Sequence, residues 1–361
     1  MDKKKNALYG AIYGDIIGRK YEFPKMQSFP SVESIEDFPE DGSFTDDTLM
    51  TLATASYILG DFETIEEAYK TIGLKYDGDY YGQGFKEWLK TPSGTINTSY
   101  ANGCLMRISP FMYFDNKEVS TVNSALCSHN HAESIWSVLR LTELYKWSGG
   151  RKISSKNIDT KKFKVFTFFN IKAVDTIEFI EQAYWYSNNT VDTIKKVISF
   201  GGDTDTNASI IGELMNFTFN DLSDNVCSYV ESKLDGYLLD ILKRFNNKVN
   251  KTFYRVCNEN TQQGLWYDFS GNFTGLIHND FNFCQNNSLE MEFDEELVGW
   301  LSAVEKLEDL WKWFSQEDIK QLQKHGWYIF EYQAEDSKFY DRFQHLVIKQ
   351  DTSKVIRKIE L

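Results

Sequence analysis

The chain has 361 residues, a net charge of −14, 42% hydrophobic residues and 25% charged residues. Because its length exceeds the roughly 250–300 residues at which a single hydrophobic core stops growing, we expect one large domain with a smaller one appended. The negative charge argues against nucleic acid or an anionic membrane as the main partner, but it leaves room for a local pocket that binds a phosphate-bearing small molecule.

The cysteines and the apolar runs limit the compartment in which we expect the protein. The five cysteines are odd in number, widely spaced and without a Cys-x-x-Cys pair, so the sequence indicates neither a disulfide framework nor a zinc site. No apolar run approaches the roughly 20 residues of a membrane helix, and the first apolar run is interrupted by Asp15. These features predict a cytoplasmic protein without a membrane partner.

Residues 6–18 are predicted to form a helix with an unusual glycine face. Gly10, Gly14 and Gly18 are four residues apart and therefore lie on one side of the helix. Because a glycine inside a helix costs about 1 kcal/mol relative to alanine, three in register indicate close packing against another backbone. Asp15 is a carboxylate within this otherwise apolar helix, which an ordinary core helix would not require.

Glu22 follows this helix and is the first candidate catalytic residue. Pro24 favours an extended conformation in the residue before it, so Glu22 is expected on a loop directly after a buried helix. Such a loop could carry a mobile catalytic carboxylate, while the alternative interpretation is an ordinary surface glutamate.

The first acidic cluster opens the next predicted helix, residues 46–59. Thr45 is followed by the adjacent carboxylates Asp46 and Asp47, which fall in the first turn, where free N–H groups and the helix dipole favour negative charge. A second helix is predicted over residues 62–72, and a glycine-rich loop over 77–84.

A polar stretch further along the chain is a candidate for ligand binding. Asn102 and Gly103 predict a turn with exposed amides, and Ser99 and Tyr100 precede it, so the stretch could hold phosphate and sugar hydroxyl groups. His129 lies just before a helix predicted over residues 132–146, and we interpret it as a binding-loop residue rather than a metal ligand.

The second acidic cluster follows helices predicted at 172–186 and 191–199. Gly201 and Gly202 allow a tight turn, after which Asp203, Asp205 and Thr206 begin a run of small and apolar residues. This pattern predicts another helix with carboxylates at its N-terminus.

The ligand atoms of the two clusters indicate the kind of metal they could bind. Both clusters supply only oxygen, which selects Mg²⁺, Mn²⁺ or Ca²⁺ over zinc or copper. Adjacent aspartates in a helix point about 100° apart and could therefore serve two neighbouring ions. A pair of ions can position water and polarise a substrate oxygen. The alternative is that both clusters are helix caps without a metal.

The pattern of polar and apolar residues changes after about residue 250. A helix predicted over 228–246 closes an all-helical domain of residues 1–248, and residues 249–361 are expected to form a small α+β domain. Apolar residues spaced by three and four from Leu297 to Phe314 predict an amphipathic helix, and Ser315 is expected to cap a short helix ending at His325. Strands are predicted over residues 327–332, 345–349 and 355–359, with the Trp and Tyr side chains in the core.

Six motifs, in this order, resemble those of the ADP-ribosylglycohydrolases, the family of the dinitrogenase reductase-activating glycohydrolase. The motifs are Gly10-Ala11-Ile12-Tyr13-Gly14-Asp15, Tyr21-Glu22, Phe44-Thr45-Asp46-Asp47-Thr48, Ser99-Tyr100-Ala101-Asn102-Gly103-Cys104-Leu105-Met106-Arg107, Ser128-His129-Asn130-His131 and Gly201-Gly202-Asp203-Thr204-Asp205-Thr206. The resemblance covers residues 7–245, and the combination of motifs is far more specific than any one of them.

The resemblance implies an all-α orthogonal helical domain with a binuclear magnesium or manganese centre in a cleft. Carried over by position, the implied metal ligands are Thr45, Asp46, Asp47, Asp203, Asp205 and Thr206. The implied catalytic carboxylates are Glu22, Asp46 and Asp205. The positions that match those holding the diphosphate and riboses of ADP-ribose are Ser99, Tyr100, Asn102, Gly103 and His129.

The implied activity is metal-dependent hydrolysis of the glycosidic bond between ADP-ribose and a modified side chain, with arginine as the default. One alternative keeps the hydrolase but gives it a small ADP-ribose derivative as substrate. The other is an immunity-type protein that binds and occludes an ADP-ribosyltransferase through its C-terminal domain. The chain departs from the family at Ala101, where glycine is common, and at Cys104-Leu105, where small residues are common.

Overall fold

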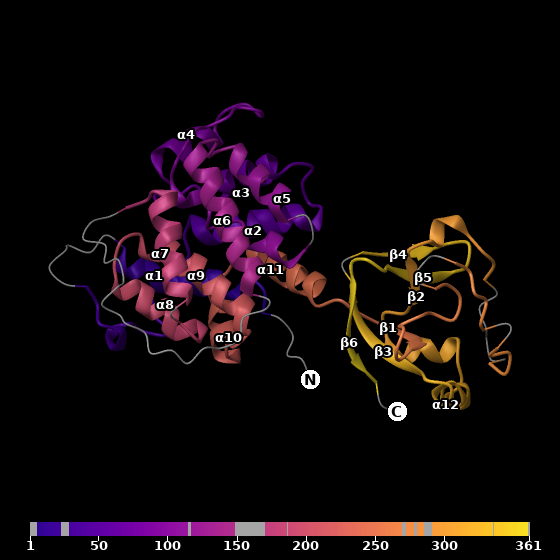
Figure 1. Cartoon of the computed structure of the whole chain (residues 1–361). Coiled ribbons are helices and arrows are strands. Elements are labelled where there is room, and N and C mark those ends of the chain that lie inside the picture. Colours follow the sequence, from indigo (N-terminus) through magenta and orange to yellow (C-terminus); the bar gives the residue numbers. More distant parts are fainter. Residues whose placement is uncertain are drawn as a thin grey trace. The chain divides into compact units, whose positions relative to one another are not determined.

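The computed structural model describes residues 6–22, 29–114, 117–148, 170–185, 187–268, 272–277, 280–284, 291–334 and 336–359. The chain divides into two compact units, residues 3–247 and residues 248–361, and each is described here by itself (Figure 1). Pro24, on which the prediction of a loop at Glu22 depends, lies outside the described residues. Within the described parts, no helix combines the length and the apolar character that crossing a membrane requires.

The first unit is built from helices, as predicted. Its longer helices are α1 (Tyr9–Gly18), α2 (Asp46–Leu59), α3 (Ile65–Lys75), α4 (Gln83–Leu89), α5 (Lys117–Leu126), α6 (Ala132–Ser148), α7 (Ala173–Trp185), α8 (Thr190–Ser199), α9 (Thr204–Phe219), α10 (Asp224–Lys233) and α11 (Gly236–Val249). Short 3₁₀ segments include η1 (Arg19–Tyr21), η2 (Val32–Ser34), η3 (Asn102–Cys104) and η4 (Ser109–Tyr113). The helices α4 and α5 were not predicted from the sequence.

Helices α1 and α9 are packed backbone to backbone, which confirms the interpretation of the glycine face. Every residue of α1 is buried, and α9 is buried from Thr204 to Asn216. A Cβ atom at Gly10 or Gly14 would lie closer than 3.0 Å to backbone atoms of Gly212 or Ala208. Such contact is open only to residues without a side chain, so the glycines set how close the two helices come.

The helix predicted over residues 228–246 is wrong as a single element. The structure has α10 and α11 instead, separated at Leu234, whose backbone is extended. The Asp235 carboxylate accepts hydrogen bonds from the backbone N–H groups of Tyr237 and Leu238, each at 3.0 Å. Asp235 thus caps the start of α11, and this local interaction overrides an apolar periodicity that continues across the break.

The second unit contains six strands and one longer helix among its described residues. The elements are β1 (Thr252–Asn258), η6 (Glu295–Leu297), β2 (Trp300–Ala303), η7 (Leu307–Lys312), α12 (Gln316–Lys324), β3 (Trp327–Ala334), β4 (Ser337–Tyr340), β5 (His345–Lys349) and β6 (Ser353–Lys358). All strand pairs are antiparallel, in one sheet of order β1-β3-β6 and another of order β2-β5-β4. An isolated bridge between Tyr254 and Val304 links β1 to the end of β2. The expected α+β class is confirmed.

The amphipathic helix predicted between Leu297 and Phe314 is wrong. The structure has strand β2 there, flanked by the 3₁₀ segments η6 and η7. Gly299 has φ = +80°, which ends η6, and Leu301 pairs with Ile348 across the sheet. Apolar residues three and four apart fit a helix, but they also fit a short strand joined to a 3₁₀ turn. The presence of a partner strand favours the strand over the helix.

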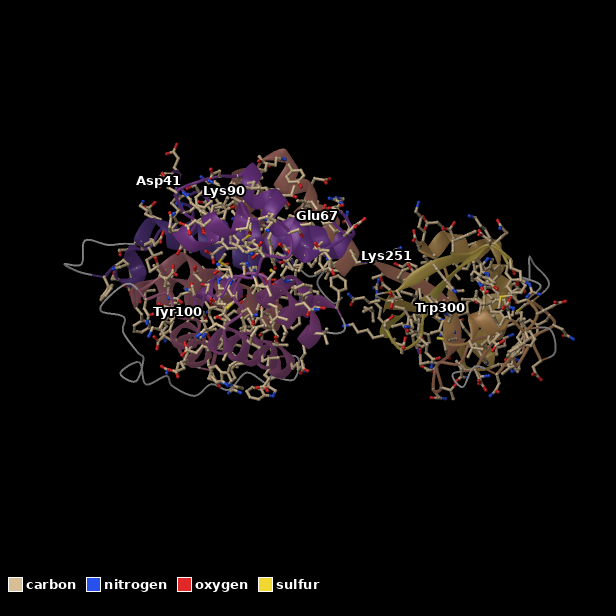
Figure 2. The ribbon with its side chains drawn as sticks, turned by 90° about the horizontal axis from the view of Figure 1, so that it is seen from above. Asp41, Glu67, Lys90, Tyr100, Lys251 and Trp300 are labelled. Atoms are coloured by element: carbon tan, nitrogen blue, oxygen red, sulfur yellow. The ribbon has the colours of Figure 1, made fainter. Side chains whose placement is uncertain are left out.

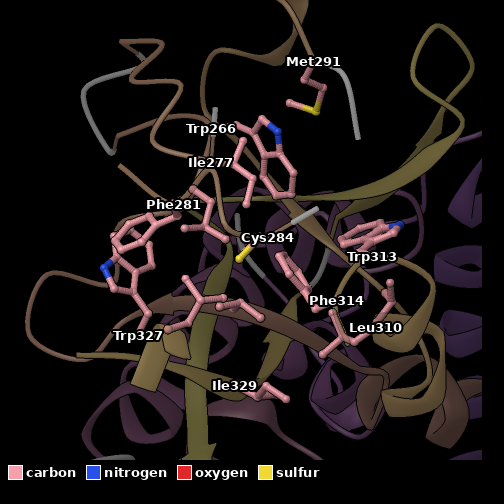
Figure 3. Close-up of a cluster of buried hydrophobic side chains, with 14 of the residues drawn as sticks. Trp266, Ile277, Phe281, Cys284, Met291, Leu310, Trp313, Phe314, Trp327 and Ile329 are labelled. Carbon is pink, nitrogen blue, oxygen red and sulfur yellow. The ribbon is translucent and has the colours of Figure 1, made fainter. Parts of the chain in front are cut away.

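The other predictions for the second unit are confirmed. Ser315 forms a capping box with Asp318 at the start of α12, and strands β3, β5 and β6 occur where they were expected. The aromatic side chains form its core, in which Trp266, Trp313 and Trp327 are all at least 91% buried (Figure 3). Their burial confirms a structural role for these rings rather than an exposed binding platform.

The packing of α1 on α9 gives a testable prediction. Gly14→Ala should lower the free energy of unfolding by about 2–3 kcal/mol, because the added methyl group meets the backbone of Ala208, which cannot rotate away. Gly236→Ala is the matched control: nothing lies within 4 Å of its added Cβ, so stability should be unchanged or slightly higher. Urea unfolding measures both, and equal stability of the two variants would contradict the predicted packing.

Candidate functional site

The two acidic clusters predicted from the sequence meet at the N-termini of α2 and α9. Asp47 lies in the first turn of α2, and Asp205 in the first turn of α9. The Thr206 hydroxyl donates to Asp47 Oδ2 at 3.0 Å and joins the two helix ends directly. Oxygen atoms of Asp15, Asp47 and Asp205 lie within 4.8 Å of one another. Residues about 160 positions apart in the chain therefore form one site.

Asp15 holds the start of α2 in place. Its Oδ2 accepts hydrogen bonds from the backbone N–H groups of Thr45 and Thr48, at 2.9 and 3.1 Å. The two threonine hydroxyls also donate to this carboxylate, at 2.8 and 2.5 Å. A carboxylate of α1 thus caps α2 from outside, satisfying N–H groups that a helix start leaves free. This explains the buried aspartate noticed in the sequence.

Asp203 completes the cluster from the turn before α9. Gly201 and Gly202 have φ values of +74° and +85°, and this left-handed turn brings Asp203 to the helix start. Its side chain does not cap the helix, because Oδ2 accepts a hydrogen bond from Asn102 Nδ2 at 2.8 Å. Asn102 also donates to Thr176 Oγ1, so its amide orients an acidic side chain in addition to lining the cavity.

Glu22 joins the cluster from the end of η1. Its carboxylate oxygen lies within 4.8 Å of oxygens of Asp203 and Asp205. Partial burial, followed by the neighbouring negative charge of Asp205, raises the pKa of Glu22 to about 8, although Arg19 acts in the opposite direction. Without a cation nearby, Glu22 is therefore mostly protonated at neutral pH.

The remaining carboxylates of the cluster resist ionisation for the same reasons. Burial and mutual repulsion raise the pKa of Asp46, Asp47 and Asp205 well above the ordinary value, and burial raises that of Asp203 to about 6. Like charges this close require protons or cations between them. Asp47 Oδ1 is buried and has no hydrogen-bond partner among the described residues, as expected of an atom available to a metal ion. The all-oxygen donor set fits a hard divalent cation.

The cluster opens into a cavity of about 540 Å³. Of the predicted site residues, those lining it are Glu22, Asp46, Asp47, Ser99, Asn102, Gly103, His129, Asp203, Asp205 and Thr206. Thr45 lies fully buried behind the wall, between Asp15 and Asp47. Tyr100, labelled in Figure 2, is not part of the lining, and its side chain is 49% exposed. Its ring meets that of His131 edge to face.

Several cavity residues were not identified from the sequence. They are Arg19, Asp79, Tyr80, Tyr81, Gly82, Gln83, Gly84, Phe85, Asn97, Ala101, Met106, Arg107 and Ile171. Arg19 donates to Ser43 Oγ at 2.7 Å and to the carbonyl of Phe44 at 2.9 Å, so it ties the end of α1 to the start of the first acidic cluster. Tyr80 and Tyr81 form an aromatic wall with Phe85 of α4, and the two tyrosines come from a glycine-rich stretch whose composition indicates only a loop.

Comparison with known proteins relates the sequence and the fold to one family. Residues 1–159 match the model of a family described as ADP-ribosylglycohydrolase. A solved chain described as "ADP-ribosylglycohydrolase-related protein complex" superposes with a TM-score of 0.51 at 17% identity, covering 68% of this chain and all of that one. No match was found among curated proteins.

These comparisons confirm the resemblance and the fold class predicted from the motifs. Proteins of this family generally hydrolyse ADP-ribose linkages and generally bind divalent metals. The second acidic cluster, around Asp203 and Asp205, lies beyond the matched residues. It is the tertiary structure that brings this cluster against the matched part of the chain.

The role of Asp15 can be tested by its effect on metal binding. Asp15→Asn leaves one acceptor oxygen for four donors, so the start of α2 should shift and the affinity for Mg²⁺ should fall about 10- to 100-fold. Glu213→Gln is a matched control, because Glu213 is equally buried and accepts hydrogen bonds from the N–H groups of Leu8 and Ala11, away from the cavity.

Both substitutions should lower stability by about 1–3 kcal/mol, but only Asp15→Asn should weaken Mg²⁺ binding measured by calorimetry. Equal Mg²⁺ affinities in the two variants would show that the cap does not position the cluster.

The raised pKa values predict how metal and pH act together. Glu22 and Asp203 have pKa values of about 8 and about 6 in the folded protein, against ordinary values of 4.5 and 3.8. At pH values between the ordinary pKa of each group and its pKa in the folded protein, the folded, metal-free protein binds more protons than the unfolded chain. The contribution of these groups to the free energy of unfolding therefore decreases as pH rises.

A bound cation would replace those protons and remove the penalty. The rise in Tm on adding Mg²⁺ to chelator-treated protein should therefore be larger at pH 8 than at pH 6, as measured by thermal unfolding. A rise that shrinks or stays constant with increasing pH would argue against a cation at this cluster.

Proposed function

We propose that the protein is a metal-dependent hydrolase that removes ADP-ribose from a modified side chain, because residues 1–159 match the ADP-ribosylglycohydrolase family model. The observation that carries this proposal is the meeting of the two carboxylate clusters at the wall of one cavity. Neither helix end alone could hold a pair of cations beside a bound nucleotide sugar.

The proposed cofactor is a pair of Mg²⁺ ions, with Mn²⁺ as a substitute. The residues proposed to hold it are Thr45, Asp46, Asp47, Asp203, Asp205 and Thr206. When bound, such ions polarise substrate oxygens and lower the pKa of a coordinated water. The buried, unpartnered Asp47 Oδ1 and the shared hydrogen bond between Thr206 and Asp47 support this assignment.

The carboxylates of the site have two proposed roles, orienting the substrate and transferring a proton. Asp46 and Asp205 would orient the ribose hydroxyl groups at the cluster, and Glu22 would carry the proton during cleavage at C1″ of the distal ribose. Glu22 suits this role because it is only partly buried and its oxygens lie beside those of Asp203 and Asp205. A group whose pKa lies near neutrality can both give and accept a proton.

Arginine is the proposed attachment site of ADP-ribose. Its support is electrostatic: Asp79 lines the cavity, and with cations bound Glu22 would ionise beside it, so the wall would favour a cationic guanidinium leaving group over a neutral hydroxyl. Ser99, Asn102, Gly103 and His129 are proposed to hold the rest of the ADP-ribose. Tyr100 would contact it only from the rim. The proposed partner is an ADP-ribosylated protein. The proposed location is the cytoplasm, as expected from the sequence.

The test is release of ADP-ribose from an ADP-ribosylated arginine peptide in the presence of Mg²⁺. Asp205→Ala should lower the rate at least about 100-fold, because it removes a group at the centre of the cluster. Asp224→Ala is the matched control: Asp224 also lies in the first turn of a helix, α10, but is exposed and outside the cavity, so the rate should not change. Activity of the Asp205 variant equal to that of the control would refute the assignment.

The same assay separates the alternative functions. Release from a small ADP-ribose derivative but not from the peptide would favour the small-molecule hydrolase. Binding to an ADP-ribosyltransferase that survives Asp205→Ala, without release from either substrate, would favour the immunity-type protein.

A further inference from the structure

A fully buried arginine, Arg107, lies in the wall of the cavity. Arg107 has no exposed surface, and its Nη2 donates to the carbonyl of Ser124 at 2.7 Å and to Ser128 Oγ at 2.6 Å. Its guanidinium stacks over the Tyr69 ring at 4.1 Å. Within the described ranges no carboxylate forms an ion pair with it, and its Nε and Nη1 atoms have no hydrogen-bond partner. A buried cation without a counter-ion is costly, which indicates that the charge serves the neighbouring cavity.

The contact with Ser128 decides the state of His129. Ser128 Oγ receives a hydrogen from Arg107 and lies 2.9 Å from His129 Nδ1. Arginine can only donate, so the hydroxyl hydrogen of Ser128 goes to one of two neighbours, His129 Nδ1 or the Cys127 sulfur, which is a much weaker acceptor. Because an imidazole nitrogen accepts more strongly than a thiol, this contact favours an unprotonated Nδ1. The ring hydrogen is then on Nε2, and the ring is neutral.

The other ring nitrogen is available to a ligand. His129 lines the cavity beside Gly103, and a Cβ atom at Gly103 would lie 3.3 Å from Nε2. Nε2 has no hydrogen-bond partner in the described part of the chain. The Phe85 ring, 6.5 Å away between centroids, is the neighbour on the aromatic wall. Burial and the charge of Arg107 hold the pKa of His129 well below its usual value, in agreement with a neutral ring.

We propose that Arg107, acting through the Ser128 hydroxyl, is a positioning residue that holds His129 as a neutral Nε2–H donor toward a phosphate oxygen of the substrate. This inference rests on the proposed function for the identity of the ligand, but the state of the ring is a property of the free protein. Arg107 also supplies a positive charge in the cavity wall, whose other described charged residues are largely acidic. That charge attracts the diphosphate to this wall and away from the carboxylate cluster.

The state of the ring is tested first by NMR of the full chain labelled with ¹⁵N-histidine. The chain has five histidines, and His129→Asn identifies the signal. We expect a neutral Nε2–H ring that stays neutral between pH 8 and pH 5.5. A ring with hydrogen on Nδ1, or one that titrates near pH 6.5, overturns the inference.

Variants then test the connection. Ser128→Ala should give a mixture of the two tautomers, because it removes the partner of Nδ1. Ser137→Ala is the matched control: Ser137 is equally buried, but its hydroxyl donates to the carbonyl of Glu133. It should keep the wild-type pattern. Arg107→Met should let the ring titrate closer to its ordinary pKa, and if this variant does not fold, Ser128→Ala still decides the question.

Binding of ADP-ribose with Mg²⁺, measured by calorimetry, completes the test. Ser128→Ala should bind about three- to tenfold more weakly than the wild type, as expected for loss of one oriented hydrogen bond, and Ser137→Ala should bind equally well. Wild-type affinity in Ser128→Ala overturns the positioning role. Failure of the wild type itself to bind ADP-ribose would instead refute the proposed function, while the tautomer result would stand by itself.

Discussion

The helical unit depends on buried carboxylates that cap helices from outside. Glu213 of α9 accepts hydrogen bonds from the N–H groups of Leu8 and Ala11 at the start of α1. Asp15 of α1 in turn accepts those of Thr45 and Thr48 at the start of α2. Each helix is thus positioned by the one before it in the series α9, α1, α2. Both helices that carry the acidic clusters belong to this series, but only its second cap, Asp15, lies at the cluster itself.

Placing several carboxylates side by side is unfavourable, and the fold provides only part of the compensation. The N-termini of α2 and α9 both point at the cluster, and hydrogen bonds from Thr206 and Asn102 satisfy individual oxygens. Burial nevertheless raises the pKa of every aspartate proposed as a ligand. The remaining repulsion is what makes the site selective for divalent cations in the proposed function. On another wall of the cavity, Arg107 is the converse, a buried cation that forms no ion pair with any carboxylate the structure describes.

The second unit shows where periodicity misleads. Between Leu297 and Phe314 the apolar spacing fits a helix, but strand β5 offers β2 a hydrogen-bonding partner, and Gly299 interrupts any continuous helix. Helix α12 was predicted correctly because its signal is local: Ser315 and Asp318 form a capping box within four residues. The buried tryptophans give this unit its own core, independent of the site in the helical unit.

The sequence by itself determined the helical class of the first unit, the helix α2, the glycine face of α1 and the oxygen-only character of both acidic clusters. These follow from spacing and side-chain chemistry within short stretches. Only the tertiary structure decided that Asp15 is a cap, that Tyr80, Tyr81 and Phe85 form a cavity wall, and that Arg107 reaches His129 through Ser128. Each of these depends on contacts between segments distant in the chain, and local periodicity carries no information about which distant segments meet.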